Sequence, residues 1–256
     1  MLSSNQQKFV TSLHVKKFRQ KYRKFTVEGE KIAIELLAQN RTPVHAIFAT
    51  ERWISENGEA LDPLLEKVNV VSEAELRKIS TLTTPNQVLI VAGMPDLPSP
   101  EALLEPDFCL FLDGIQDPGN LGTILRVADW FGIPAVFCSP DTVDVFSPKV
   151  VQSSMGAFLR VVSFETTLQD ICSLRPGIPV LGAVLGGENI YDASLPASGL
   201  LVIGSEAQGI RPETEALLTQ RLTIPRHPNG RAESLNAAVA TGILTALIRK
   251  AGPRVD

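Results

Sequence analysis

The sequence predicts an α/β protein in two parts, a smaller α/β domain followed by a larger domain built on a parallel sheet. Apolar runs after residue 107 are short, do not alternate with polar residues, and are separated by helical patterns. Strands of this kind are buried on both faces, as in a parallel sheet covered by helices. A stretch rich in proline at residues 94–107 shows little periodicity and predicts a linker between the two domains.

The first predicted domain covers residues 1–93. A helix is expected at residues 31–39, where Ile32, Leu36 and Leu37 are apolar. Ser72 and Glu75 have the spacing of a capping box, which predicts a helix from there to residue 79. Strands are expected at residues 44–49, 68–71 and 87–93. This alternation of helix and strand predicts a small α/β domain.

The second predicted domain covers residues 108–256. Strands are expected at residues 108–113, 135–138, 180–185 and 200–204, and a further short apolar strand is expected to end at Ile224. Helices are expected at residues 120–131, 147–155, 166–174 and 212–219, and a last helix is expected to open at residues 234–236. In the last helix Leu235, Val239, Ile243, Leu244 and Leu247 recur at helical spacing, and the small residues between them allow close backbone packing, so we expect burial around much of the helix. These small residues are Ala237, Ala238, Ala240 and Gly242.

Charge is unevenly distributed along the chain. The 256 residues carry a net charge of -4, yet residues 1–31 hold eight Lys or Arg against Glu28 and Glu30, a local charge of +6. A basic arm on an acidic body predicts contact with a polyanion such as RNA. The absence of acidic residues from the first 27 also fits a mitochondrial transit peptide. Phe18, Tyr22 and Phe25, interleaved with the basic residues, favour a segment of the folded protein over a transit peptide; a solvated basic helix face is compatible with this interpretation.

Composition limits the class of protein. The apolar runs are far shorter than the roughly 20 residues of a membrane helix, so no span is expected. Cys109, Cys138 and Cys172 are widely spaced and odd in number, which indicates core thiols in a reducing compartment, the cytoplasm. The three histidines have no spacing typical of metal ligands, and no metal site is expected.

Three polar turns follow predicted strands, in the regions of residues 113–126, 204–211 and 224–236. Ligands of parallel sheets bind beyond the carboxyl ends of the strands, so these turns fall where a site is expected. The glycines of residues 204–209 have Walker A spacing, but Ile210 and Arg211 replace the Lys and Ser or Thr of a P-loop. No Gly-x-Gly-x-x-Gly is present either, so a common nucleotide-binding loop is not predicted.

In this order, the three turns resemble the motifs of the SpoU family of RNA 2'-O-ribose methyltransferases. The resemblance covers roughly the last 150 residues, and the first domain is similar to the ribosomal-protein-like substrate-binding domain of many SpoU enzymes. It implies a SPOUT-type parallel sheet with a deep trefoil knot, which no sequence pattern would have suggested alone. It also implies that S-adenosylmethionine binds in the knotted loops, with contacts from Leu185, Gly186, Gly204, Ile224 and Leu235.

The resemblance assigns the chemistry to Asn120, Arg126, Glu206, Ser234 and Asn236. The matching arginine of the family has been proposed as the general base. An arginine keeps its proton far above pH 7 in water, so we expect Arg126 to clamp the nucleotide phosphate and stabilise the developing alkoxide. That phosphate or a water molecule would assist proton removal.

The other polar residues are expected to support this arrangement. Glu206 would brace Arg126 or the motif loops, and Ser234 and Asn236 would hold the ribose or the carboxylate end of the cofactor. Asn120 would orient polar groups at the mouth of its helix; the alternative is a plain N-cap for that helix. Arg226, Ala237 and Ala238 depart from residues frequent in the family, which bears on substrate choice and local packing.

The expected activity is methyl transfer to a ribose 2'-hydroxyl of structured RNA, with ribosomal RNA favoured and transfer RNA also compatible. The alternative is a catalytically silent RNA-binding or ribosome-assembly protein of the same fold. Relatives work as homodimers, so an isologous dimer is expected by resemblance. The sequence does not indicate which nucleotide is modified, or whether the role is housekeeping or antibiotic resistance.

Overall fold

The computed structural model describes residues 1–39, 41–104 and 107–250. The chain divides into two compact units, the first made of Met1–Leu97 and Asp144–Leu159, and the second of Pro98–Val143 and Arg160–Asp256. Residues 105–106 of the predicted linker and residues 251–256 of the predicted second domain lie outside the described residues. The helix expected at residues 147–155 is present, and its contacts place it in the first unit.

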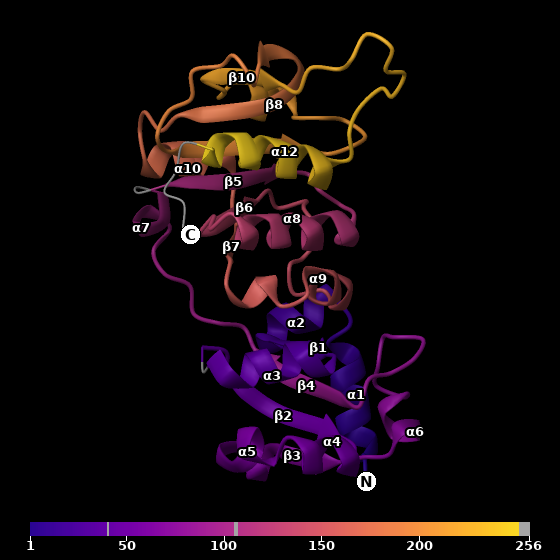
Figure 1. Cartoon of the computed structure of the whole chain (residues 1–256). Helices are drawn as coiled ribbons and strands as arrows, with labels where there is room; N and C mark the ends of the chain where they lie inside the picture. The colour runs from indigo at the N-terminus through magenta and orange to yellow at the C-terminus, as the bar shows by residue number, and fades with distance from the viewer. Residues whose placement is uncertain (40, 105–106, 251–256) are drawn as a thin grey trace. The chain divides into compact units, whose positions relative to one another are not determined.

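The first unit contains a mixed sheet of four strands (Figure 1). The strands are β1 (Lys24–Glu28), β2 (Val44–Ala49), β3 (Val68–Val70) and β4 (Val88–Gly93), in the order β1-β4-β2-β3. β4 is antiparallel to β1 and β2, and β3 is parallel to β2. The three predicted strands are confirmed to within a residue. β1 was not predicted, because its short buried run begins within the basic arm.

Helices surround this sheet. They are α1 (Ser4–Ser12), α2 (Lys16–Tyr22), α3 (Glu30–Gln39), α4 (Glu51–Glu56), α5 (Gly58–Leu61), η1 (Asp62–Lys67), α6 (Glu73–Leu76), α9 (Pro148–Ser154) and η2 (Ala157–Leu159). The predicted capping box is confirmed, since the Ser72 side chain accepts from the Glu75 N–H and the Glu75 carboxylate accepts from the Ser72 N–H. α6 nevertheless ends at Leu76, short of Ile79. Val10 and Leu13 of the basic arm are fully buried in the core of this unit.

The second unit contains a sheet of six strands in the order β10-β8-β9-β5-β6-β7. The strands are β5 (Phe108–Asp113), β6 (Ala135–Cys138), β7 (Val162–Glu165), β8 (Val180–Asn189), β9 (Gly199–Gly204) and β10 (Gln220–Thr223). Every neighbouring pair is parallel, which confirms the predicted sheet. The short strand expected to end at Ile224 is present as β10, which ends one residue earlier. β7 was not predicted, because it is short and its side chains are mostly half-buried.

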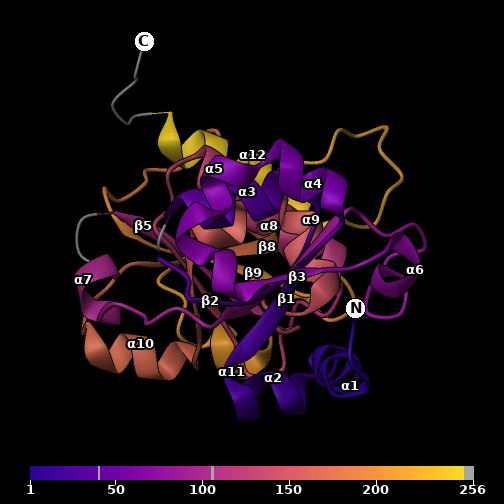
Figure 2. The same cartoon turned by 90° about the horizontal axis from the view of Figure 1, so that it is seen from below.

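Helices cover both faces of this sheet. They are α7 (Pro100–Leu104), α8 (Pro118–Trp130), α10 (Leu168–Leu174), α11 (Pro212–Glu215) and α12 (Ala237–Arg249). α8 and α12 lie on one face, and α10 and α11 on the other (Figure 2). α7 lies inside the predicted linker, and its Leu104 is buried in the core of the second unit. α11 ends four residues before the predicted limit at residue 219.

α12 departs most from the prediction. It begins at Ala237 instead of residues 234–236, and of the expected stripe only Leu244 is buried. Leu235 is 45% exposed and Val239 is 51% exposed. The buried side is formed instead by small residues together with Leu244, namely Ala237, Ala238, Thr241 and Thr245. Close packing at Ala237 and Ala238 is thus confirmed. The expected burial of Leu235 and Val239 was wrong, because close packing against neighbouring elements selects small side chains over large ones.

Cys109 and Cys138 are buried free thiols, as predicted. Burial raises the pKa of each thiol to about 12, so neither is a nucleophile at neutral pH. Across the described residues, no helix is both long and apolar enough to cross a membrane.

Candidate functional site

Two of the predicted motif turns leave the sheet side by side. β5 and β9 pair in parallel, and their last residues, Asp113 and Gly204, are register partners. The chain segments that follow these residues therefore emerge together at the carboxyl edge of the sheet. This is the edge at which parallel α/β sheets bind their ligands.

The first turn leads into α8 through an aspartate cap. The Asp117 carboxylate accepts a hydrogen bond from the Asn120 N–H at 2.8 Å, and Pro118 occupies the first helical position. The alternative that Asn120 itself caps the helix is wrong, since Asn120 is the third helical residue. Its side chain is consequently available to other parts of the site.

The third turn ends at Asn236, which caps α12. Its Oδ1 atom accepts from the N–H groups of Ala238 at 3.0 Å and Val239 at 3.3 Å. The Nδ2 atom of the same amide points to the other two motifs. It donates to Asn120 Oδ1 at 2.8 Å and to Glu206 Oε1 at 2.5 Å.

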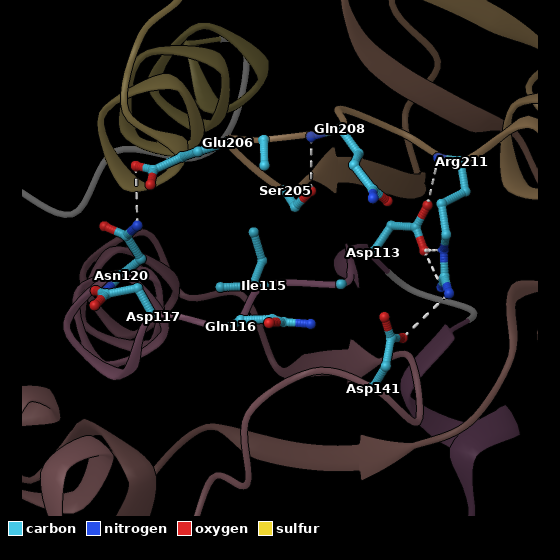
Figure 3. A pocket seen from close by; sticks show the side chains of 12 residues that line it. Asp113, Ile115, Gln116, Asp117, Asn120, Asp141, Ser205, Glu206, Gln208 and Arg211 are labelled. Atoms are coloured by element: carbon cyan, nitrogen blue, oxygen red, sulfur yellow. Dashed lines mark hydrogen bonds and ion pairs between the residues drawn. The ribbon is translucent and has the colours of Figure 1, made fainter.

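Glu206, from the second turn, closes this network. Its Oε1 atom also accepts a hydrogen bond from Asn120 Nδ2 at 3.0 Å (Figure 3). The carboxylate thus lies close to the N-termini of α8 and α12, where the positive ends of the helix dipoles favour a negative charge. Asn120, Glu206 and Asn236 come from three motifs far apart in the sequence, and they form one hydrogen-bonded cluster.

A second anchor holds the same turn from its other end. Asp113, with a fully buried side chain, accepts from the Arg211 backbone N–H and from Arg211 Nε, each at 2.8 Å, and also from Arg211 Nη2. Arg211 Nη1 lies 3.2 Å from Asp141 Oδ1. Hydrogen bonding to Asp113 raises the pKa of the Arg211 guanidinium, so its charge is secure at any physiological pH. This pair was not predicted from the sequence. The signal that could have indicated it was an aspartate at the end of one strand and an arginine at the end of a motif turn.

The second turn is tight and needs glycine. Ser205 and Gly209 form an antiparallel bridge across it, and Gly209 has a φ of +69°. A Cβ atom on Gly204 would collide with the backbone of Gly209 and Ile210. This close approach explains why the motif begins with glycine, independently of any ligand.

A pocket of about 240 Å³ lies between the first two turns (Figure 3). It is lined by residues 113–117, Asn120, Asp141, residues 205–208 and Arg211. Of the predicted site residues, Asn120 and Glu206 line it, and the predicted cofactor contacts do not. The pocket therefore marks the space beside the amide and carboxylate cluster rather than the whole of the predicted site.

Arg126 and Ser234 lie outside the hydrogen-bonded cluster. Arg126 is exposed on α8, six residues after Asn120, so its side chain leaves the helix about 240° around the axis from Asn120. Of the two bracing partners predicted for Glu206, the motif loops are observed, while no hydrogen bond from Arg126 occurs among the described residues. Ser234 is exposed in the loop before α12.

The predicted cofactor contacts fall into two groups. Leu185 and Gly186 lie where the register between β8 and β10 shifts, and Thr223 Oγ1 donates to the Leu185 carbonyl at 3.3 Å, which brings Ile224 to the same place. Leu185 is 80% exposed, and a Cβ atom on Gly186 would meet open space. Gly204 and Leu235 belong to the segments that carry Glu206 and Asn236.

The fold and this cluster define a class of protein, a parallel α/β protein with a polar ligand site assembled from three turns at the carboxyl edge of its sheet. Residues 107–246 match the SpoU rRNA Methylase family, and residues 5–90 match the MRM3-like substrate binding domain. The chain belongs to the SpoU rRNA Methylase family.

Individual relatives match over nearly the whole chain. The 23S rRNA (guanosine(2553)-2'-O)-methyltransferase RlmP of Bacillus subtilis is 30% identical over 240 residues, which cover 93% of each protein. The solved structure of a TrmH-family protein from Porphyromonas gingivalis is 41% identical, with a TM-score of 0.84 over 98% of this chain and 99% of that one. A rRNA methyltransferase from Sinorhizobium meliloti, solved with bound AdoMet, is 25% identical, with a TM-score of 0.87 over 99% and 97%.

Proposed function

We propose that the protein transfers a methyl group from S-adenosylmethionine to a ribose 2'-hydroxyl of structured RNA. Ribosomal RNA is the favoured substrate, since the RlmP relative is named for a guanosine of 23S rRNA; transfer RNA remains compatible. The observation that carries the proposal is the cluster of Asn120, Glu206 and Asn236, which joins the three motif turns in one site.

The proposed division of labour follows the predicted domains. Residues 1–93 would bind the RNA substrate, and residues 108–256 would carry the methyltransferase site in a trefoil-knotted fold. Residues 94–107 would link these two domains. The match of residues 5–90 to a substrate-binding domain supports the first role. The match of residues 107–246 to the methylase family supports the last.

The residues proposed for the cofactor are Leu185, Gly186, Gly204, Ile224 and Leu235, and they fit a ligand with an apolar and a polar part. Leu185 offers exposed apolar surface, and the space over Gly186 is open to backbone contact. S-adenosylmethionine held there would supply an activated methyl group on a cationic sulfur, and the Sinorhizobium meliloti relative was solved with AdoMet bound. The protein must then align the ribose hydroxyl and help to remove its proton.

We infer that Glu206 and Asn236 are positioning residues, because every polar atom of the Asn236 side chain is used by the α12 cap or the cluster. They fix Asn120, which borders the pocket. Arg126, exposed and free to move, would clamp the phosphate of the target nucleotide, and Ser234 would bond to the ribose or to the carboxylate end of the cofactor. Alignment of this kind contributes on the order of 7 to 11 kcal/mol to a reaction barrier.

A cytoplasmic homodimer is the proposed working form. Leu235, just before the Asn236 cap, and Val239, on the first turn of α12, expose large apolar side chains. An isologous interface over this face would cover them and would place the symmetry axis close to the site.

The test of the proposed function is methyl transfer itself. The full chain is incubated with ribosomal RNA from a strain that lacks the gene and with S-adenosylmethionine tritiated on the methyl group, and the RNA is digested to nucleosides. The proposal predicts label in a 2'-O-methylated nucleoside. Label on a base would contradict transfer to the ribose and indicate a base methyltransferase. No label with either ribosomal or transfer RNA, while RNA binding persists, would instead support the catalytically silent RNA-binding protein.

A further inference from the structure

We propose that α1 and α2 of the first unit form a stacking platform for unpaired RNA bases, with Tyr22 as its exposed ring. This rests on the proposed function, because RNA is taken as the substrate. The first unit would recognise a loop or a single-stranded segment of that RNA rather than a duplex.

Three aromatic rings carry the proposal. Phe18 and Tyr22 lie one turn apart on α2, with ring centroids 6.3 Å apart and nearly parallel planes at 13°. Phe9 of α1 meets Tyr22 edge to face, at 5.3 Å between centroids. α1 and α2 lie side by side in both views of the chain (Figures 1 and 2). Tyr22 is the most exposed of the three residues, with an exposed fraction of 38%, while Phe9 and Phe18 are half-buried.

The rings lie within a field of positive charge. Lys21 Nζ lies 5.3 Å from the centre of the Tyr22 ring, and Lys24 Nζ lies 5.7 Å from the centre of the Phe9 ring. Lys17 and Arg23 are exposed on the same helix and its cap, and the first 27 residues contain no acidic side chain. Basic groups that follow a phosphate chain, interleaved with aromatic rings, are the features of proteins that bind single strands.

α2 is fixed firmly enough to present a ring in one place. Arg19 is buried and donates to Asp144 Oδ2 from Nε at 2.8 Å and from Nη2 at 2.6 Å. Its Nη1 atom donates to the Leu13 carbonyl at 2.8 Å, which ties the α1–α2 connection to the same side chain. Binding of a base to Tyr22 would therefore cost little free energy for ordering the protein.

The geometry favours unpaired bases over a duplex. In a duplex, both faces of an internal base are already stacked on their neighbours, whereas a base in a loop has a free face. An exposed ring contributes on the order of 5- to 150-fold in affinity for each stacked base. Contacts of the lysines with phosphate would act on either form of RNA.

The experiment compares Tyr22→Leu, Tyr22→Trp and wild type in the full chain. Leucine keeps apolar packing against Phe9 and Phe18 but has no ring face, and tryptophan restores one. Binding to a fluorescent single-stranded 12-mer and to a blunt duplex of the same sequence is measured by anisotropy at fixed salt. Tyr191→Leu, a change at a tyrosine that is 62% exposed in the second unit, is the matched control.

We expect Tyr22→Leu to weaken binding to the single strand by at least 5-fold, Tyr22→Trp to restore it, and duplex binding to change little. Equal single-strand affinity for Tyr22→Leu and wild type would overturn the platform, as would an equal loss on the duplex. Methyl transfer is measured separately on the wild type. Its absence would remove the proposed function and leave the platform standing if the binding differences are observed.

Discussion

At the scale of single residues, the site depends on side chains that have more than one partner. Asn236 caps α12 with its oxygen and joins two other motifs with its nitrogen. An asparagine is suited to this because its amide presents an acceptor and two donors from one rigid group. The capping role is visible in the sequence as a polar residue before a helix, and the joining role is not, because Asn120 and Glu206 are remote along the chain.

Asn236→Ser separates these two roles. Serine is about as good an N-cap as asparagine, so we expect the free energy of unfolding to change by less than about 0.5 kcal/mol. Serine cannot reach Glu206 and Asn120 as the amide does, and hydrogen bonds to charged groups contribute about 1.5–3 kcal/mol, so the methyl-transfer rate should fall about 10- to 100-fold. Urea unfolding and single-turnover transfer are the two measurements. Normal transfer by a stably folded variant would show that the cluster does not support the reaction.

Arg211→Gln tests the second anchor. It leaves the buried Asp113 carboxylate without its guanidinium partner, and loss of one member of a buried pair typically costs about 3–5 kcal/mol. We expect a marked drop in the midpoint of urea unfolding. Asp113→Asn combined with Arg211→Gln should recover part of it, since no unpaired charge is then buried. If Arg211→Gln alone were as stable as the wild type, the Asp113–Arg211 pair would not be an anchor.

At the scale of elements, the buried strands could be predicted from the sequence, whereas several helix ends and the buried side of the last helix could not. β5, β6 and β9 are continuous apolar runs. Their ends could therefore be predicted without knowing which elements lie beside them in the fold. α12 was different, because large apolar residues recur at helical spacing on one side and small ones on another. A Cβ atom on Gly242 would be 3.8 Å from Val127 of α8, an ordinary van der Waals distance, so the two helices pack closely at this point.

Two glycine substitutions distinguish a structural glycine from one exposed at the proposed cofactor site. Gly204→Ala would place a Cβ atom against the backbone of Gly209 and Ile210, so we expect a lower melting temperature and loss of transfer. Gly186→Ala meets open space, so we expect the melting temperature to stay within about 2 °C, with weaker S-adenosylmethionine binding by calorimetry. Unchanged cofactor affinity in Gly186→Ala would remove this residue from the proposed site.

At the scale of the whole molecule, the site could be located from the order of three motifs but not constructed from them. Asn120 and Asn236 are brought together by the parallel course of the sheet and by α8 and α12, which pack with their N-termini at the same edge. No local sequence pattern predicts that Asn120 and Asn236 come together. Their convergence was expected from the family resemblance, and the hydrogen bonds of the cluster show how the three turns are joined.

Val239→Asp tests the proposed dimer. Val239 is already half exposed, so a charge there should leave the folded chain intact. At the centre of an isologous interface, the same change would meet its own copy and desolvate two like charges. We expect a dimer for the wild type and a monomer for the variant by light scattering after gel filtration. A monomeric wild type would rule out the proposed assembly.

The claim on which the other proposals depend is that three distant turns act as one site. A double-mutant cycle on the single-turnover methyl-transfer rate tests it most directly, with Asn120→Ala, Asn236→Ser and the double variant compared with wild type. One shared site predicts strong coupling, with the double variant transferring methyl groups about as fast as the slower single variant. Losses that simply multiply would show that Asn120 and Asn236 act independently, and would contradict the account.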